Sequence, residues 1–110
     1  DMEDLSYTVD VICPMVYPSH IGSIFYNKYK HTERPYQIVK DGGIRALKMI
    51  NRKALLRPYI QGFNLMSPTW GPVYITDQIK GSRESGCSGY SIWNAKGEYD
   101  VPYKALKEKK

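Results

Sequence analysis

Three stretches of the sequence end an apolar run with aromatic, amide and hydroxyl side chains. They read "MVYPSH" (15–20), "YIQGFN" (59–64) and "SIWNAKGEY" (91–99). Aromatic rings can stack on the C–H face of a sugar, and side-chain amides can both donate hydrogen bonds to hydroxyl groups and accept them. The set suits a neutral, polyhydroxylated ligand better than a phosphate, which would call for Arg, Lys or a glycine-rich helix start. The residues concerned are Tyr17, His20, Gln61, Asn64, Trp93 and Asn94.

Each of these side chains also has a purely structural interpretation. A Trp at the end of a strand, such as Trp93, can simply close a barrel. His20 can pack within its loop instead of lining a pocket. An inward-facing Gln61 must have a hydrogen-bond partner, which an internal network would supply as well as a ligand would. His31 lies in a charged segment, and we expect it to be solvated.

No complete catalytic set is visible in the sequence. Glycoside hydrolysis needs two carboxylates roughly 5 to 10 Å apart, yet no acidic residue ends a strand body. Asp10 precedes an apolar run, and we expect Glu98 and Asp100, which follow another, to be solubilising loop residues. Cys13 and Cys87 have neither metal-ligand spacing nor the pattern of a disulfide framework, and we expect Cys13 to be a buried free thiol. We therefore predict no metal and no cofactor.

The segments that carry these residues alternate with helical segments along the chain. Segments rich in Val, Ile and aromatic residues predict buried parallel strands near 8–17, 56–63 and 89–94. Between them, apolar residues at helical spacing predict helices within 33–53 and 71–86. This order is typical of βαβ units with right-handed crossovers. In such folds ligands bind at the carboxyl ends of the strands, where the aromatic and amide residues fall.

Local signals set the limits of the helices. Pro35 and Pro72 suit a first helical turn, and Gly86 can cap the end of the second long helix. Gly42 and Gly43 weaken the first by about 1 kcal/mol each relative to Ala. They indicate either close packing against the sheet or a break in the helix. Weaker helical pieces are expected at the ends of the chain, at 2–7 and 101–110.

Length and composition favour a single segment with a modest core. The chain has 110 residues, of which 42% are hydrophobic and 25% charged, an ordinary balance for a globular protein. A full parallel barrel takes about 250 residues. We therefore expect residues 1–110 to form one α/β segment of about three βα units, a portion of a (β/α)8 TIM-type barrel with parallel strands.

The net charge of +5 is concentrated at the carboxyl end. The tail 104–110 holds four lysines and one glutamate, and therefore three of the five net charges. We interpret it as a solvated, frayed tail, because a nucleic-acid surface needs a basic face with polar or aromatic readers. No apolar run approaches the roughly 18 residues of a membrane span, and the acidic opening "DMEDLSY" does not read as a signal peptide. We expect neither nucleic acid nor a membrane as a partner.

The strand motifs together resemble one known family. "VDVICPMVYPSH", "LRPYIQGF" and "GCSGYSIWNAKGEY" resemble the carboxyl-terminal part of the bacterial family named putative glycosyl hydrolase domain, over roughly residues 9–95. The first motif is the most specific of the three. Members are (β/α)8 barrels distantly similar to α-amylase-like glycosidases. The resemblance implies the carboxyl-terminal part of such a barrel, from a bacterial glycoside hydrolase that we expect to be secreted or in the cell envelope.

The resemblance also implies a set of sugar-contacting residues and a catalyst that lies elsewhere. In the family, an Asp-containing motif ending in Arg-Phe-Pro lies on an upstream strand, and these 110 residues have no such segment. The catalytic carboxylate is therefore implied to lie outside them, and the segment alone to be inactive. The implied ligand is an oligo- or polysaccharide. The residues placed at the mouth of the pocket are Met15, Tyr17, Ser19, His20, Gln61, Trp93 and Asn94.

Two alternatives remain open from the sequence. One concerns function, because a non-catalytic carbohydrate-binding or scaffold module on a half barrel would show the same residues. The other concerns partners. Three strands taken from a barrel have two open edges and bare inward faces, so we expect the chain either to pair with the amino-terminal half of the barrel or to self-associate.

Overall fold

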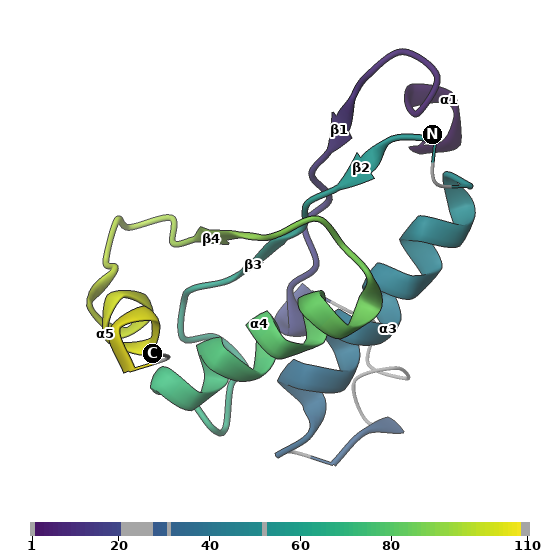
Figure 1. The fold of residues 1–110 in the computed structure, drawn as a ribbon. Helices are drawn as coiled ribbons and strands as arrows, with labels where there is room; N and C mark the ends of the chain where they lie inside the picture. The colour runs from purple at the N-terminus through teal and green to yellow at the C-terminus, as the bar shows by residue number, and fades with distance from the viewer. Residues whose placement is uncertain (1, 21–27, 31, 52, 109–110) are drawn as a thin grey trace.

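The computed structural model shows a mixed α/β fold in which helices pack on a small set of parallel strands (Figure 1). It describes residues 2–20, 28–30, 32–51 and 53–108. The α/β class with parallel strands that the sequence predicts is confirmed. The elements in chain order are α1 (Met2–Leu5), β1 (Val11–Ile12), the 3-10 turn η1 (Pro18–His20), α3 (Arg34–Met49), β2 (Leu55–Leu56), β3 (Tyr59–Gln61), α4 (Pro72–Ser85), β4 (Ser91–Trp93) and α5 (Asp100–Glu108).

The segment that carries β2 and β3 is the central one of three parallel segments. Parallel pairing joins β1 to β2 and β3 to β4. A parallel bridge between Met15 and Tyr59 connects the two pairs. Each segment therefore lies beside the next one in the sequence, and a long helix occurs in each connection, α3 in the first and α4 in the second. This is the βαβ order that the sequence predicts.

The regular ladders are shorter than the strands predicted from the sequence. Pro58 divides the central segment into β2 and β3, because proline has no N–H to give to a ladder. Hydrogen bonds continue across the break, since Arg57 N donates to Ile12 O and Tyr59 N donates to Pro14 O, both at 2.8 Å. The strand ends are therefore held in place although the assigned strands are only two or three residues long.

The two long helices have the limits that the sequence predicts. Pro35 lies in the first turn of α3, and Pro72 is the first residue of α4. Gly86 follows α4 as its C-cap with φ of 92°, a left-handed conformation that glycine adopts without strain.

Close packing, and not a helix break, accounts for the paired glycines of α3. The helix runs unbroken through Gly42 and Gly43. A Cβ on Gly42 would lie 2.9 Å from Val16 Cγ1, and one on Gly43 would lie 2.6 Å from Ser85 Oγ. Gly42 thus faces the segment after β1. Gly43 faces α4, whereas the sequence indicated packing against the sheet.

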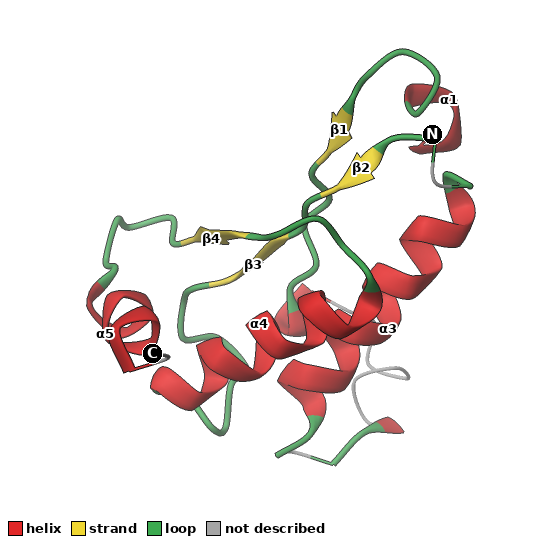
Figure 2. Ribbon diagram, viewed as in Figure 1, coloured by secondary structure: helices red, strands yellow, loops and turns green. Residues whose placement is uncertain are grey.

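The core fills the space between the helices and one face of the strands. Figure 2 shows α3 and α4 together on one side of β3 and β4. One cluster of buried residues joins β3 to α3, α4 and α5, and consists of Val39, Ile60, Ile75, Ile79 and Ala105. The other joins β2 to the second half of α3, and consists of Ala46, Leu47, Ile50, Ala54 and Leu56.

The opposite face of the strands is apolar and open to solvent. Val11 and Leu55 lie opposite each other in the β1–β2 register and are 45% and 56% exposed, while Met15 is 73% and Trp93 45% exposed. Cys13 is also exposed. The prediction of a buried thiol is therefore wrong. Residues two apart in a strand share a face, so Cys13 lies with Val11 and Met15 on the face away from the helices. We call this set, Val11, Cys13, Met15, Leu55 and Trp93, the bare face.

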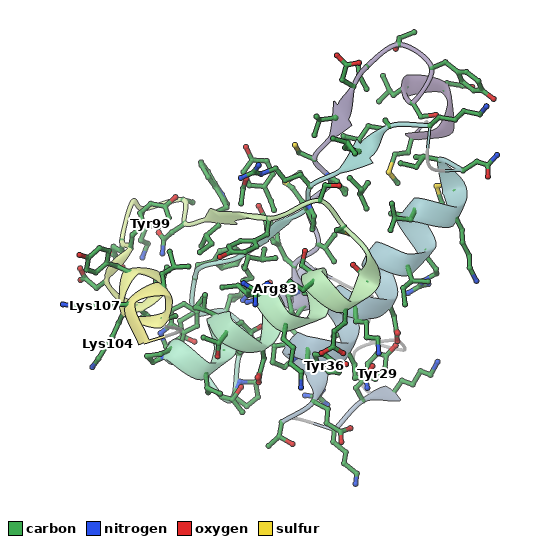
Figure 3. All side chains as sticks on the ribbon, viewed as in Figure 1. Tyr29, Tyr36, Arg83, Tyr99, Lys104 and Lys107 are labelled. Atoms are coloured by element: carbon green, nitrogen blue, oxygen red, sulfur yellow. The ribbon has the colours of Figure 1, made fainter. Side chains whose placement is uncertain are left out.

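The carboxyl-terminal residues form the helix α5. Lys104 and Lys107 lie on α5, where Figure 3 labels them, and both are exposed. The helical piece predicted at the carboxyl end is confirmed up to residue 108, and its lysines are solvated as expected; residues 109–110 lie outside the described part. Among the helices of the described residues, none combines the length and apolar character needed to cross a bilayer.

Gly81 sets the distance between α3 and α4. A Cβ at this position would lie 2.5 Å from Tyr36 O and 3.1 Å from Lys40 N, both backbone atoms of α3. We expect Gly81→Ala to lower the free energy of unfolding by about 2 kcal/mol, because the overpacking penalty exceeds the gain in helix propensity. Urea unfolding measures this change. Arg83→Ala, an exposed position on the same helix, should change the value by less than about 0.5 kcal/mol; equal effects of the two variants would contradict the packing argument.

Candidate functional site

The carboxyl ends of the parallel segments meet at one edge, and the predicted site residues converge there. After β1 the chain turns into η1, where Ser19 N donates to Gln61 Oε1 at 3.0 Å. Gln61 ends β3 and lies opposite Trp93, the last residue of β4. His20 is the last residue of η1, and its side chain lies outside the described part, as does the whole of His31.

An open cavity of about 350 Å³ lies on the bare face at this edge. It is lined by Cys13, Met15, Tyr17, Tyr59 and Trp93. The exposed indole and thioether give it an apolar surface, and the two phenols give it hydroxyl groups. It can therefore hold a molecule that has both C–H faces and hydroxyls. We call it the aromatic cavity.

Tyr17 forms one wall of the aromatic cavity and is itself largely buried. Its ring meets Phe63 edge to face, with ring centroids 5.3 Å apart and an interplanar angle of 84°. Burial raises the pKa of the Tyr17 phenol, with smaller contributions from Tyr59 and Tyr99. The hydroxyl is therefore neutral at physiological pH and can donate a hydrogen bond.

Every polar position of the Gln61 side chain is used inside the protein. Oε1 accepts from Ser19 N at 3.0 Å and from Tyr74 OH at 3.3 Å, and Nε2 donates to Phe63 O and Leu65 O at 2.9 Å. A primary amide has two N–H donors and two acceptor lone pairs, so this side chain is saturated. Of the two interpretations that the sequence left open, the structure places Gln61 in an internal network that holds η1 and the loop after β3.

A second buried glutamine completes the edge of β3. Tyr59 N and O bond to the β1 segment, and Gln61, two residues later, points its N and O to the same side. Beside Gln61 the β1 segment has already turned into η1 and no longer runs along β3. Gln78 of α4 fills the place of the missing strand, because its Oε1 accepts from Gln61 N at 2.7 Å and its Nε2 donates to Gln61 O at 2.8 Å. Sequence analysis missed this residue, although its position between Ile75 and Ile79 on the apolar stripe of α4 was a signal.

Asn94 fixes the turn that follows β4. Its Nδ2 donates to Gly62 O at 2.8 Å, and its Oδ1 accepts from Lys96 N at 2.9 Å and Glu98 N at 3.2 Å. Asn94 N donates to the hydroxyl of Tyr99 at 3.1 Å, and Figure 3 labels that tyrosine where the chain leads toward α5. Like Gln61, this predicted residue ties two strand ends together.

A second cavity, of about 300 Å³, lies beyond the ends of β3 and β4. It is more polar than the first, and we call it the polar cavity. The sequence placed Asn64 at a strand end but did not point to Phe63. It also did not point to Tyr59 of the aromatic cavity, although Tyr59 lies two residues before Gln61 and so on the same face of the strand. The lining residues of the polar cavity are Phe63, Asn64, Asn94, Ala95, Lys96 and Glu98.

A family model, named putative glycosyl hydrolase domain, matches residues 1–99. The chain belongs to this family. No curated protein and no solved structure gives a significant match. The family suggested by the strand motifs is thereby confirmed, and the match extends the resemblance to the amino-terminal helix α1.

The carboxylates of this glycosyl hydrolase domain segment are spread along the fold. Glu98 borders the polar cavity, Asp10 lies just before β1 at the opposite end of the strands, and Asp100 begins α5. Among the described residues, no group of three His, Cys, Asp or Glu side chains is arranged to hold a metal ion.

Proposed function

We propose that this chain is the carboxyl-terminal part of a (β/α)8 barrel in a glycoside hydrolase and that its strand ends contact an oligo- or polysaccharide. The observation that carries the proposal is the aromatic cavity. It lies at the carboxyl ends of parallel strands, the position of ligands in parallel α/β folds, in a chain of a glycosyl hydrolase family.

Each residue of the site has a distinct role in this proposal. The half-exposed ring of Trp93 stacks on the C–H face of a sugar unit, and the Met15 side chain extends that apolar surface. The neutral Tyr17 hydroxyl donates to a sugar oxygen, and Ser19 and His20 add hydrogen bonds from η1. Gln61 and Asn94 act as positioning residues, because their own hydrogen bonds hold the strand ends.

The bare face supports the barrel part of the proposal. In a closed barrel every strand has two neighbours, and inward side chains are covered by those of other strands. Val11 and Leu55 would then be interior residues. Strands of the amino-terminal half are the proposed cover, and they also supply the two carboxylates that hydrolysis needs, so that residues 1–110 bind sugar without cleaving it. The two-carboxylate mechanism requires no cofactor.

Trp93→Ala and Tyr17→Ala should each weaken oligosaccharide binding about tenfold or more, because both remove an aromatic side chain at the centre of the site. Isothermal titration with cello-, malto- and chito-oligosaccharides, in the protein that contains the whole barrel, measures the effect. Tyr103→Ala removes an exposed tyrosine from α5 and should leave affinity unchanged, as should His31→Ala.

The same titrations decide against the proposal if Tyr103→Ala or His31→Ala loses as much affinity as Trp93→Ala. Hydrolysis assays on the bound oligosaccharides decide the class of protein. Cleavage supports the glycoside hydrolase, whereas binding without cleavage by the whole barrel would support a non-catalytic carbohydrate-binding module.

A further inference from the structure

We infer that the polar cavity is a second sugar subsite, in which Glu98 and Asn64 hold the hydroxyl groups of the unit next to the one stacked on Trp93. The inference rests on the proposed function and goes beyond it, because it assigns a minimum ligand of two linked sugar units and names residues that recognise the second.

The two cavities are direct neighbours. Tyr17 lines the aromatic cavity and Phe63 lines the polar cavity, and these two rings meet edge to face with 5.3 Å between centroids. The consecutive residues Trp93 and Asn94 likewise border one cavity each. A ligand that extends from the aromatic cavity along the strand ends would therefore reach the polar cavity.

The polar cavity offers donors and acceptors from residues whose backbone is fixed. Asn94 Oδ1 binds the backbone N–H groups of both Lys96 and Glu98, which fixes the turn that carries these two side chains. Asn64 Oδ1 accepts from Ser67 Oγ at 2.7 Å, so that the amide nitrogen is oriented as a donor. The half-buried ring of Phe63 supplies an apolar wall.

The charges of the polar cavity favour a hydroxyl-bearing unit over a charged one. Glu98 supplies one carboxylate and Lys96 one ammonium group, so the two charges offset each other and neither an anion nor a cation gains a net attraction. A sugar hydroxyl can donate to Glu98 and accept from Lys96 or Asn64 at the same time. Bonds to charged groups are the stronger kind of hydrogen bond, so Glu98 should contribute most of the selectivity.

Chain-length dependence tests the inference. With the sugar series that the protein binds best, the disaccharide should bind about tenfold more tightly than the monosaccharide. Glu98→Gln removes the negative charge and keeps the size of the side chain at an exposed loop position. It should remove most of that gain and leave monosaccharide affinity unchanged. Glu33→Gln, exposed at the start of α3, is the matched control and should alter neither affinity. In NMR spectra the amides of Asn64 and Lys96 should shift with the disaccharide but not with the monosaccharide.

The outcomes separate the inference from the proposed function. Equal affinities for mono- and disaccharide, with both lost in Trp93→Ala, would overturn the second subsite and leave the proposed function intact. A disaccharide affinity that Glu98→Gln leaves unchanged would also overturn the subsite. Failure of every sugar to bind would overturn the proposed function and the subsite together.

Discussion

Gln78→Met is expected to lower the free energy of unfolding by about 4 kcal/mol. The substitution keeps roughly the volume of the side chain but removes its amide, and so leaves Gln61 N and Gln61 O without their partner inside the core. An unsatisfied buried backbone group costs about 1–3 kcal/mol, and two such groups are affected. Both glutamine side chains are completely buried, so bulk solvent does not reach the groups that lose their partner.

Urea unfolding at one fixed protein concentration measures this loss. Gln37→Met is the matched control, since Gln37 is a half-buried glutamine on α3, and it should change the value by less than about 0.5 kcal/mol. Similar losses in the two variants would show that Gln78 is not a substitute for a neighbouring strand. Sugar binding offers a second readout, because the displaced strand end carries the site, and affinity should fall in Gln78→Met even at temperatures where the variant is folded.

Residues 1–110 on their own are expected to self-associate at low micromolar concentration. The bare face exposes apolar side chains from β1, β2 and β4. Burying even a few hundred Å² of such surface contributes on the order of 10 kcal/mol at ~25 cal/mol per Å². This is comparable with the whole stability of a small domain, about 5–15 kcal/mol, so an uncovered monomer is the less favourable state. Sedimentation velocity measures the association.

A charge on the bare face should shift the equilibrium toward the monomer. Leu55→Arg places a guanidinium group on that face, opposite Val11 in the β1–β2 register. Leu65→Arg makes the same change at a similarly exposed leucine in the loop after β3, outside the residues that define the bare face, and should leave the sedimentation profile as it is. A single monomeric species of the unmodified chain, with a sharp and cooperative thermal transition, would contradict the half-barrel interpretation and favour a complete small domain.

The parts of the fold that follow from local signals could be predicted from the sequence. Pro35, Pro72 and Gly86 act through their own backbone, and the apolar spacing of Val39, Ala46 and Leu47 depends only on the helical repeat. For this reason the long helices and the βαβ order agree with the prediction.

The parts that depend on distant neighbours could not be predicted. Cys13 is exposed because no described segment covers its face of the strand. The order of apolar residues along a strand does not reveal whether another part of the protein covers a given face. Residue type placed Gln61 and Asn94 correctly at strand ends. Whether their amides face a ligand or the backbone depends on partners elsewhere in the chain, such as Ser19, 42 residues before Gln61. Gln78 was missed for the same reason, because its role exists only once α4 has docked beside β3.

The pairing of β1 with β2 has a consequence for synthesis on the ribosome. Val11 pairs with Leu55, which is synthesised 44 positions later in the chain. At about 5–20 residues per second, the interval between the emergence of the two is roughly 2 to 9 s, whereas helices form in about a microsecond. The nascent chain therefore presents "VICPMV" as an unpaired apolar strand for seconds before its ladder can close.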